Sequence, residues 1–323
     1  MRTITVLSLI GGLLLGTVLV GYFGFAEVLR ALLSVRWSGF LAIIACQLGL
    51  IALLGLCWYV LRPHSASRLA FIWGRLIRDS SSEILPLSQL GGFVIGARAA
   101  MLLGVPAPVA VASTIVDVTM EMFAQLGYTA LGLGILAWQK PDDRLIGQIA
   151  LGLVVALLSA IGFVAAQRNG LGIVERAISR IAKQWVTGPA ELPRAIQGEI
   201  LDTYRNPRGL WLGGGLHLVA WIASSIQAWL ALRFMGVYLA LASVLAIESL
   251  LYAIRSVAFA VPNALGVQEA AYLMLGAAFG LAPETALALS LLKRARDLAI
   301  GVPALLAWQV LESGRRLRRR LDR

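Results

Sequence analysis

The sequence predicts an all-α integral membrane protein: about six full transmembrane helices plus two re-entrant helical hairpins in an inverted repeat. Three observations carry this prediction, namely the composition, the apolar runs and the charges inside those runs. Hydrophobic residues make up 59% of the 323 residues and charged residues only 14%, whereas a soluble domain carries about 25% charged residues. Apolar runs of about 20 residues can cross a bilayer. We therefore expect a single membrane domain over 1–323.

The apolar runs give the full spans in order. The first is expected at about 4–25. We interpret it as a retained helix and not a cleaved signal peptide, because its apolar part is long and Gly24-Phe25-Ala26 is a poor cleavage site. The other full spans are expected at about 38–61, 109–137, 145–167, 209–233 and 284–311.

Two mixed stretches, 65–104 and 240–281, each predict a pair of shorter helices. The first is interrupted by Asp79-Ser80-Ser81-Ser82-Glu83 and by Pro86. The second is interrupted at Arg255-Ser256 and at Pro262-Asn263. Irregular backbone at membrane depth is tolerated only inside protein or along a wet cavity. These interruptions therefore point to a central polar site.

The distribution of basic residues predicts the orientation. Six of the 28 Lys and Arg residues follow Glu312, and positive segments normally face the cytoplasm. The segments expected inside are 62–78, 168–208 and the tail, and those expected outside are 26–37, 139–144 and 234–239. The parity of crossings agrees with this charge pattern only if both mixed stretches are re-entrant hairpins. We expect a bacterial inner-membrane protein with both termini in the cytoplasm.

The polar segment of about 168–208 is expected to be a cytoplasmic amphipathic connector. One helical face is apolar, with Val174, Ala177, Ile178, Ile181 and Trp185. Such a face suits a helix lying on the membrane surface. A solvated connector docked on the helical bundle explains the pattern nearly as well.

Sliding the sequence over itself by 176 residues reveals a weak repeat. Pro86 falls on Pro262, Gly104 on Gly280, and Glu121 on Asp297. The same shift places Asp117 on Lys293 and Asp79 on Arg255. The halves, about 1–138 and 145–311, are predicted to be inverted with a polar site between them, a common plan of transporters.

Charged residues inside apolar runs are the strongest functional signal. A charge at the bilayer centre costs roughly 2.5–3.5 kcal/mol on insertion scales and is usually partnered and functional. Asp117 and Glu121 share one helix face, and Lys293, Arg296 and Asp297 share another. We expect the second group to be the partners of the first. The alternative is a purely structural set of ion pairs that locks helices together.

Proline and paired glycines near the breaks can end helices inside the protein and expose N–H groups that bind anions. Arg98 is then a candidate for a lipid phosphate, and Glu269 is expected to pair with Arg255 across the second break. The candidate transport or binding residues are Asp79, Glu83, Arg98, Asp117, Glu121, Arg255, Glu269, Lys293, Arg296 and Asp297. The candidate structural residues of the hairpins are Pro86, Gly91, Gly92, Pro262 and Gly266.

Several classes of function find no support. The chain has two histidines and two cysteines without metal-ligand spacing, and it has no metalloprotease, nucleophile-elbow, nucleotide or dinucleotide motif. We expect no metal, no cofactor, no catalytic residue and no enzymatic activity. The net charge of +11 indicates an anionic leaflet as partner, not nucleic acid.

The run Ser81 to Pro86 with Gly91-Gly92 and Arg98, followed by Asp117 and Glu121, resembles the transmembrane (flippase) region of the lysylphosphatidylglycerol synthase family. The later residues Pro262, Gly266, Glu269 and Arg296-Asp297 fit the same pattern. The resemblance covers about 5–311 and is greatest for the short hopanoid-associated branch.

The resemblance implies a lipid transporter or flippase. Membrane lipids are then the partners, with a hopanoid-related lipid or an aminoacylated phospholipid as cargo. Acidic residues would receive a cationic head group or a coupling ion, and Arg98, Arg255 and Arg296 would hold phosphate. Two alternatives stay open: an ion- or proton-coupled transporter of a small solute, and a non-transporting accessory protein of a lipid-modifying enzyme. A homo-oligomer or a partner from lipid biosynthesis is compatible with each.

Overall fold

The computed structural model describes residues 25–62, 65–85, 89–141, 145–168, 192–258, 261 and 264–321. Within these ranges the chain is helical, and no strand occurs. Several predictions lie outside them: the first helix up to residue 24, Pro86, Pro262 with Asn263, and the apolar face from Val174 to Trp185.

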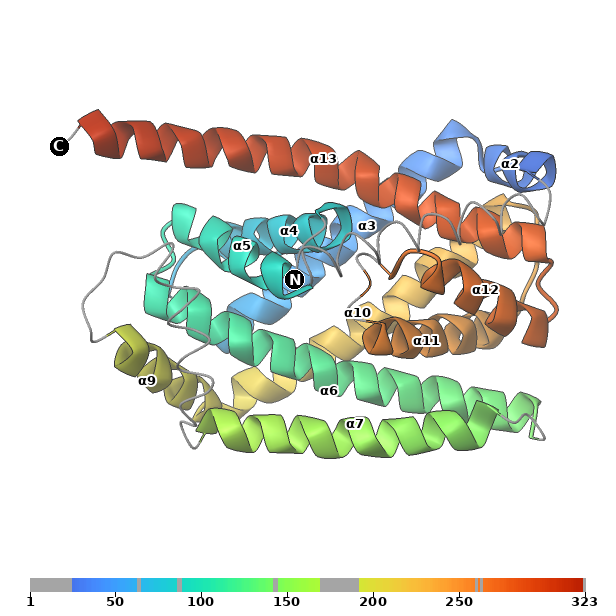
Figure 1. Ribbon diagram of the computed structural model, residues 1–323, viewed down its shortest axis with the longest axis horizontal. Coiled ribbons are helices and arrows are strands. Elements are labelled where there is room, and N and C mark those ends of the chain that lie inside the picture. Colours follow the sequence, from blue (N-terminus) through green and yellow to red (C-terminus); the bar gives the residue numbers. More distant parts are fainter. Residues whose placement is uncertain are drawn as a thin grey trace.

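The described helices run through the whole chain and form one elongated bundle (Figure 1). In chain order they are α2 (Phe25–Leu33), α3 (Arg36–Leu61), α4 (Arg68–Ile84), α5 (Gln89–Leu102), α6 (Ala107–Gln139), α7 (Leu145–Arg168), α9 (Leu192–Tyr204), α10 (Pro207–Phe234), α11 (Leu241–Val257), α12 (Val267–Ala278) and α13 (Pro283–Leu321).

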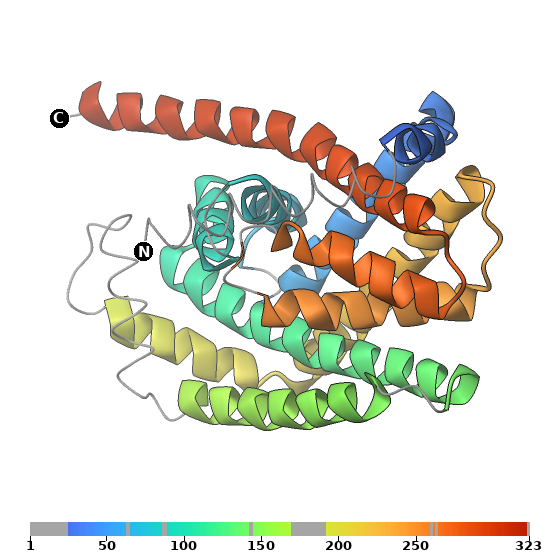
Figure 2. The same ribbon diagram turned by 45° about the vertical axis from the view of Figure 1, so that its right-hand side comes forward.

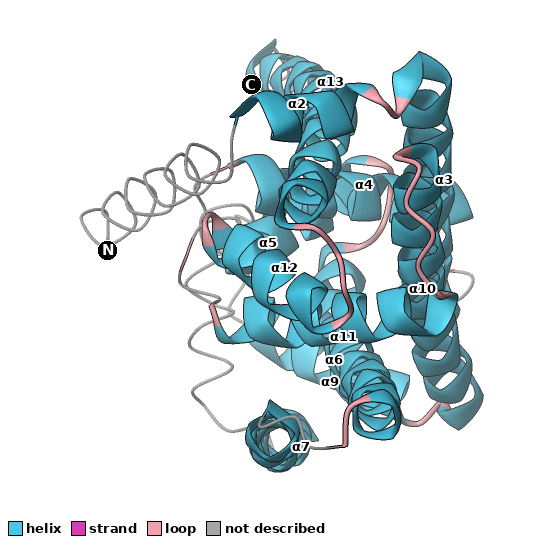
Figure 3. Cartoon of the chain, turned by 90° about the vertical axis from the view of Figure 1, so that its right-hand side faces the viewer, coloured by secondary structure: helices cyan, strands magenta, loops and turns pink. Residues whose placement is uncertain are grey.

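Four of the described helices, α3, α6, α7 and α10, are long and apolar enough to cross a membrane. Their bounds agree with the predicted spans to within a few residues. α7 lies at the edge of the bundle against α6 and α9 (Figure 3), and only 6% of its apolar window is buried within the protein. Such an uncovered apolar helix needs hydrocarbon around it, so the chain is a multi-pass membrane protein.

Exposed aromatic side chains collect at the ends of the bundle. Trp37 at the start of α3, Trp138 near the end of α6, and Tyr238 after α10 all lie at one end. Trp211 is exposed near the start of α10, at the opposite end. Tryptophan and tyrosine favour the membrane–water interface, which sets the long axis of the bundle across the membrane.

The stretch 65–104 forms the expected helix pair, but the first of its two predicted interruptions is wrong. The run from Asp79 to Glu83 belongs to α4, which ends at Ile84, and α5 begins at Gln89. Ser80 and Ser81 donate their hydroxyl hydrogens to the carbonyl oxygens of Leu76 and Ile77. The serines are therefore satisfied by the helix itself, and the polar run does not end it.

The paired glycines also differ from expectation, because Gly91 and Gly92 lie inside α5 and end no helix. A Cβ on Gly92 would lie 2.9 Å from the carbonyl oxygen of Arg78, so this glycine permits the close approach of α5 to α4. In the second pair, Arg255 and Ser256 likewise lie within α11 and do not interrupt it.

Gly266 begins the returning helix α12. It has a φ of 76°, a left-handed conformation that glycine adopts without steric cost. Its backbone N–H donates to Glu269 Oε2 at 2.8 Å. Gly266 and Glu269 thus form the start of α12, and the prediction of a structural role for Gly266 agrees with this geometry.

The two halves of the chain pack on each other crosswise. α3 runs antiparallel to α10: Gln227 Nε2 donates to the Ile43 carbonyl near one end of the pair, and Gly209 lies against the Val60 carbonyl near the other. α4 packs on α13, and α11 packs on α6 (Figure 2). The long helices α6 and α13 run in opposite directions (Figure 1).

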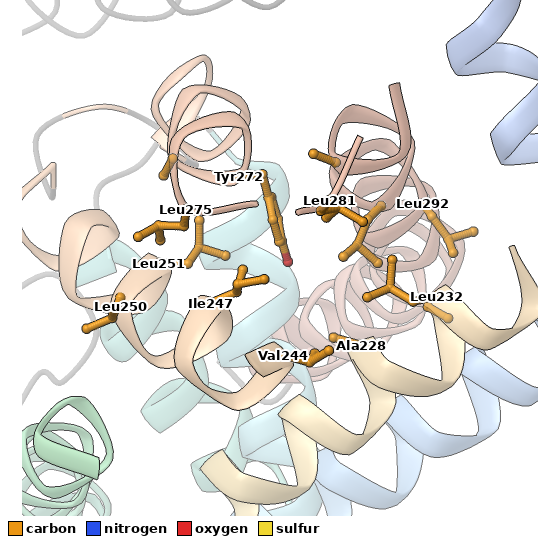
Figure 4. Close-up of a cluster of buried hydrophobic side chains, with 14 of the residues drawn as sticks. Ala228, Leu232, Val244, Ile247, Leu250, Leu251, Tyr272, Leu275, Leu281 and Leu292 are labelled. Carbon is orange, nitrogen blue, oxygen red and sulfur yellow. The ribbon is translucent and has the colours of Figure 1, made fainter. Parts of the chain in front are cut away.

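The largest apolar core lies between α10, α11, α12 and α13 (Figure 4). Tyr272, Leu251 and Leu292 are among its buried side chains. This core fixes the second hairpin, α11 with α12, against the final helix, so that the ends of α11 and α4 meet near the middle of the bundle.

α13 is eleven residues longer than the predicted span 284–311. It continues to Leu321, and Glu312 on this extension is buried against α5 by its ion pair with Arg98. The prediction ended the helix at residue 311, where the apolar run ends. The charged and polar residues that follow favour helix as well, so the helix continues.

Candidate functional site: a charged cavity between the two hairpins

A cavity of about 370 Å³ lies where the two helical hairpins meet, lined by α3, α4, α5, α6, α10, α11 and α13. One part of its wall is apolar, with Leu50, Leu54, Met122 and Ile300 among the lining residues. The charged residues that line it are Arg75, Arg78, Asp79, Glu83, Glu121, Arg255, Arg296 and Asp297.

The first charged group joins α4 to α6. Arg75 and Arg78 are one turn apart on α4, and Glu121 accepts from both, at 2.7 Å from Arg75 Nη2 and 2.5 Å from Arg78 Nη2. Arg75 Nε also donates to Asp79 Oδ2 at 2.9 Å. Arg78 Nη1 donates to Asp117 Oδ2 at 2.7 Å. We call these five residues the arginine–carboxylate cluster.

The second charged group joins the two hairpins. Arg255 at the end of α11 donates from Nη2 to Glu83 Oε1 at the end of α4, at 3.0 Å. Gln125 on α6 supports the same end of α11, since its Nε2 donates to the Tyr252 carbonyl at 3.2 Å and to Ser256 Oγ at 2.5 Å. One ion pair thus connects residues 172 positions apart in sequence.

The third charged group lies on α13. Arg296 donates from Nε and Nη2 to Oδ1 of its neighbour Asp297, at 2.9 and 2.7 Å. Its Nη1 donates to Gln227 Oε1 at 2.6 Å. The second oxygen of Asp297, Oδ2, accepts no hydrogen bond from the described residues, and it is available to a ligand.

The carboxylates stand in front of the arginines. In the cavity, the carboxylate side chains are 16–29% exposed and the guanidinium side chains 4–12%. Although the eight lining charges balance, a ligand meets oxygen atoms first. The cavity therefore favours a cationic group over an anionic one.

Aromatic rings complete this preference. Trp221 and Tyr252 line the cavity with their ring centroids 4.6 Å apart, and Phe93 lies 4.5 Å below the guanidinium carbon of Arg78. The face of an aromatic ring attracts cations, most strongly where water is excluded. Arg255 and Lys293 also lie over the Tyr252 ring, so protein cations already use these ring faces beside the carboxylates.

Four of the predicted site residues do not line the cavity. Asp117 is fully buried behind Arg78. Lys293 Nζ donates to Glu248 Oε2 at 2.7 Å and to the Tyr272 hydroxyl at 2.9 Å. The pairs Arg98–Glu312 and Glu269–Arg294 are also buried away from the cavity.

Two predicted pairings are wrong. Asp117 and Glu121 pair with Arg75 and Arg78 of their own half, and not with Lys293 and Arg296. Arg255 pairs with Glu83, and Glu269 pairs with Arg294 on the adjacent α13. The physical reason is that α4 packs on α13 and α11 packs on α6. The side chains of α4 then come within hydrogen-bonding reach of α6 and of the end of α11.

The residues that the sequence reasoning missed are Arg75, Arg78, His217 and Tyr272. Arg75 and Arg78 lie in the stretch 62–78, whose basic character was interpreted as a cytoplasmic flank. Their spacing to Asp79 on one helix was the available signal, because an Arg with an acid four residues later forms a helical ion pair. His217 stands alone in an apolar run and gave no signal.

No group of three or more His, Cys, Asp and Glu side chains among the described residues could hold a metal ion. The acids of the arginine–carboxylate cluster are held apart by the arginine side chains between them. The site is thus built from protein ion pairs with an adjoining cavity.

The fold and the site together define a class of protein: a multi-pass helical membrane protein with a charged cavity between two broken helix pairs. The family model for the lysylphosphatidylglycerol synthase TM region matches residues 7–304. The chain belongs to this family, whose membrane region is related to lipid modification. No curated protein and no solved structure matches the chain.

Proposed function

We propose that this protein is a bacterial inner-membrane lipid flippase that passes a polar-headed lipid between leaflets through the charged cavity. The observation that carries the proposal is the composite wall of the cavity, with carboxylates and aromatic rings beside an apolar side. A lipid head group can bind to the wall of carboxylates and aromatic rings, and the acyl chains of the lipid can lie along the apolar wall. Membership of a family of lipid-related membrane regions supports the same substrate class.

The arrangement of the halves supports an alternating path. α6 begins at Ala107 and α13 at Pro283, a separation that equals the 176-residue shift in sequence. Gly104 and Gly280, which precede them, both have positive φ. Together with the antiparallel course of α3 and α10, this supports an inverted repeat, in which opening can alternate between the two sides of the membrane.

The cargo that we propose carries a cationic group, because carboxylates face the cavity. An aminoacylated phospholipid meets this requirement directly, and a hopanoid-related lipid meets it if its head group bears an amine. The arginines behind the carboxylates are the proposed contacts for a phosphate. A homo-oligomer or an enzyme of lipid biosynthesis is a compatible partner.

The test is lipid movement by the purified chain in liposomes of phosphatidylglycerol that contain a head-group-labelled lipid. Dithionite destroys only the label in the outer leaflet, which is about half of the total. We expect more than half of the label to be lost only when the protein is present, because the protein brings labelled lipid from the inner leaflet to the outer one. Rapid uptake of a soluble amine without lipid movement would instead favour the alternative of a solute transporter. An absence of both would favour an accessory role beside a lipid-modifying enzyme.

A further inference from the structure

His217 is a fully buried histidine on α10 that none of the roles above uses. Its Nε2 lies 3.0 Å from Asp117 Oδ1. An ionised carboxylate only accepts hydrogen bonds, so Nε2 carries the hydrogen. The other ring nitrogen, Nδ1, is buried and has no hydrogen-bond partner among the described residues. Buried polar atoms are normally partnered, and this one retains a free lone pair.

The arginine–carboxylate cluster beside His217 is unbalanced. It joins two cations, Arg75 and Arg78, to three carboxylates, Asp79, Asp117 and Glu121. By contrast, the ion pairs Lys293–Glu248 and Arg296–Asp297 each join one cation to one carboxylate. Buried charge without compensation is unfavourable, so the cluster needs one more positive charge.

We propose that His217, which lies behind Asp117 and outside the cavity wall, is a proton site coupled to the cavity, and that it releases its proton when the cationic group of the ligand binds. When the cavity is empty, Nδ1 takes a proton from water and the imidazolium supplies the missing positive charge. When a cationic group enters beside Glu121 and Asp79, the cluster becomes balanced without the proton, which returns to water. The inference rests on the proposed function and adds proton-for-cation exchange to it.

Two carboxylates of α6, Asp117 and Glu121, interact with His217 among the described residues. Asp117 in turn pairs with Arg75 and Arg78 of α4 and interacts with Cys57 of α3. The charged groups of the other helices packed on α10 belong to one-to-one pairs: Glu199 of α9 with Arg62, Glu248 of α11 with Lys293, and Arg296 of α13 with Asp297.

Direct detection of the proton is possible because the chain has only two histidines, His64 and His217. The His64→Gln variant, labelled with ¹⁵N-histidine, leaves one imidazole whose ring nitrogens report its protonation. The protein would be placed in phosphatidylcholine nanodiscs, with or without a lipid that bears a trimethylammonium head group. Histidine ordinarily changes charge between about pH 5 and 8, which sets the range to be scanned.

We expect His217 to take up a proton within this range, and to need a more acidic solution to do so once the cationic lipid is present. That is, the midpoint of protonation moves to lower pH with the cationic lipid. Glu121→Gln should lower the midpoint and abolish the effect of the lipid, because the excess carboxylate is gone. A ring that stays neutral over the range, or a midpoint that ignores the cationic lipid, overturns the proposal. If Asp79 holds the proton in place of His217, the His217 ring stays neutral, and this outcome also overturns the proposal.

Transport provides the second measurement. In liposomes with an imposed pH gradient, movement of the trimethylammonium lipid should follow the gradient in the unmodified chain. His217→Gln should lose the response of lipid movement to the gradient. If the unmodified chain moves no lipid, the proposed flippase function is contradicted. The nanodisc titration is independent of lipid movement, and it still decides whether the proton and the cationic group compete. Gradient-driven movement that persists in His217→Gln contradicts the exchange.

Discussion

Arg255 in the last turn of α11 donates from Nη2 to Glu83 Oε1 in the last turn of α4, at 3.0 Å. This ion pair joins the ends of two hairpins from different halves of the chain. Both side chains line the cavity and both are partly exposed to it. It is therefore a contact that a ligand can compete for, and one that must open if the hairpins separate during transport.

The Glu83–Arg255 contact predicts an energetic coupling between the two hairpins. In a double-mutant cycle with Glu83→Gln and Arg255→Gln, we expect a coupling energy of roughly 0.5–3 kcal/mol, as for residues in one ion-pair network. Thermal unfolding of each purified variant in detergent measures it. Additive effects of the two substitutions would mean that the hairpin ends do not interact.

Glycines on α6 predict how closely the halves approach. A Cβ on Gly132 would lie 2.9 Å from Ser249 Cβ on α11, whereas Gly134 faces open space. We expect Gly132→Ala to destabilise by about 1–3 kcal/mol through overpacking. The matched control, Gly134→Ala, should be neutral or stabilise by about 0.5–1 kcal/mol. Equal melting temperatures for the two variants would contradict the packing of α6 on α11.

Lys293 and Glu248 predict a structural ion pair, because both are buried and neither lines the cavity. Glu248→Gln should destabilise by roughly 3–5 kcal/mol, since it leaves a buried cation without its partner. Adding Lys293→Met to Glu248→Gln should recover most of that loss. The stability of the single and double variants against heat is the measurement. No recovery in the double variant would argue against a role limited to pairing.

The orientation predicts which ends of the bundle can be labelled from outside. In a background with Cys46→Ser and Cys57→Ala, a cysteine at Lys140 should react with a membrane-impermeant maleimide in intact cells. A cysteine at Arg315 should react only after the membrane is opened, because the basic tail is expected in the cytoplasm. The reverse pattern would invert the proposed topology and, with it, the side on which each hairpin opens.

The sequence was a good guide to the helices, because an apolar run must be as long as the membrane is thick. α3, α6, α7 and α10 begin and end within a few residues of their expected positions. It was a poor guide to helix ends at polar runs. Asp79 to Glu83 stayed helical because an ion pair to Arg75 and serine bonds to the preceding turn satisfy that run.

The candidate site was predicted in part. Six of the ten residues, Asp79, Glu83, Glu121, Arg255, Arg296 and Asp297, line one cavity. Their partners could not be predicted, because pairing depends on which helices become neighbours and on the rotation of each about its axis. Asp117 shows the limit: its charge in an apolar run was evident, but its partners Arg78 and His217 come from two other helices.

The most direct test of the central claim compares two ion-paired carboxylates that differ in position. Glu121 lines the cavity, whereas Glu312 pairs with Arg98 away from it. Lipid movement in phosphatidylglycerol liposomes would be measured for Glu121→Gln and Glu312→Gln, with the thermal stability of each. The account predicts that Glu121→Gln abolishes movement and that Glu312→Gln retains it at comparable stability. Full movement by Glu121→Gln would contradict the cavity as the path of the lipid.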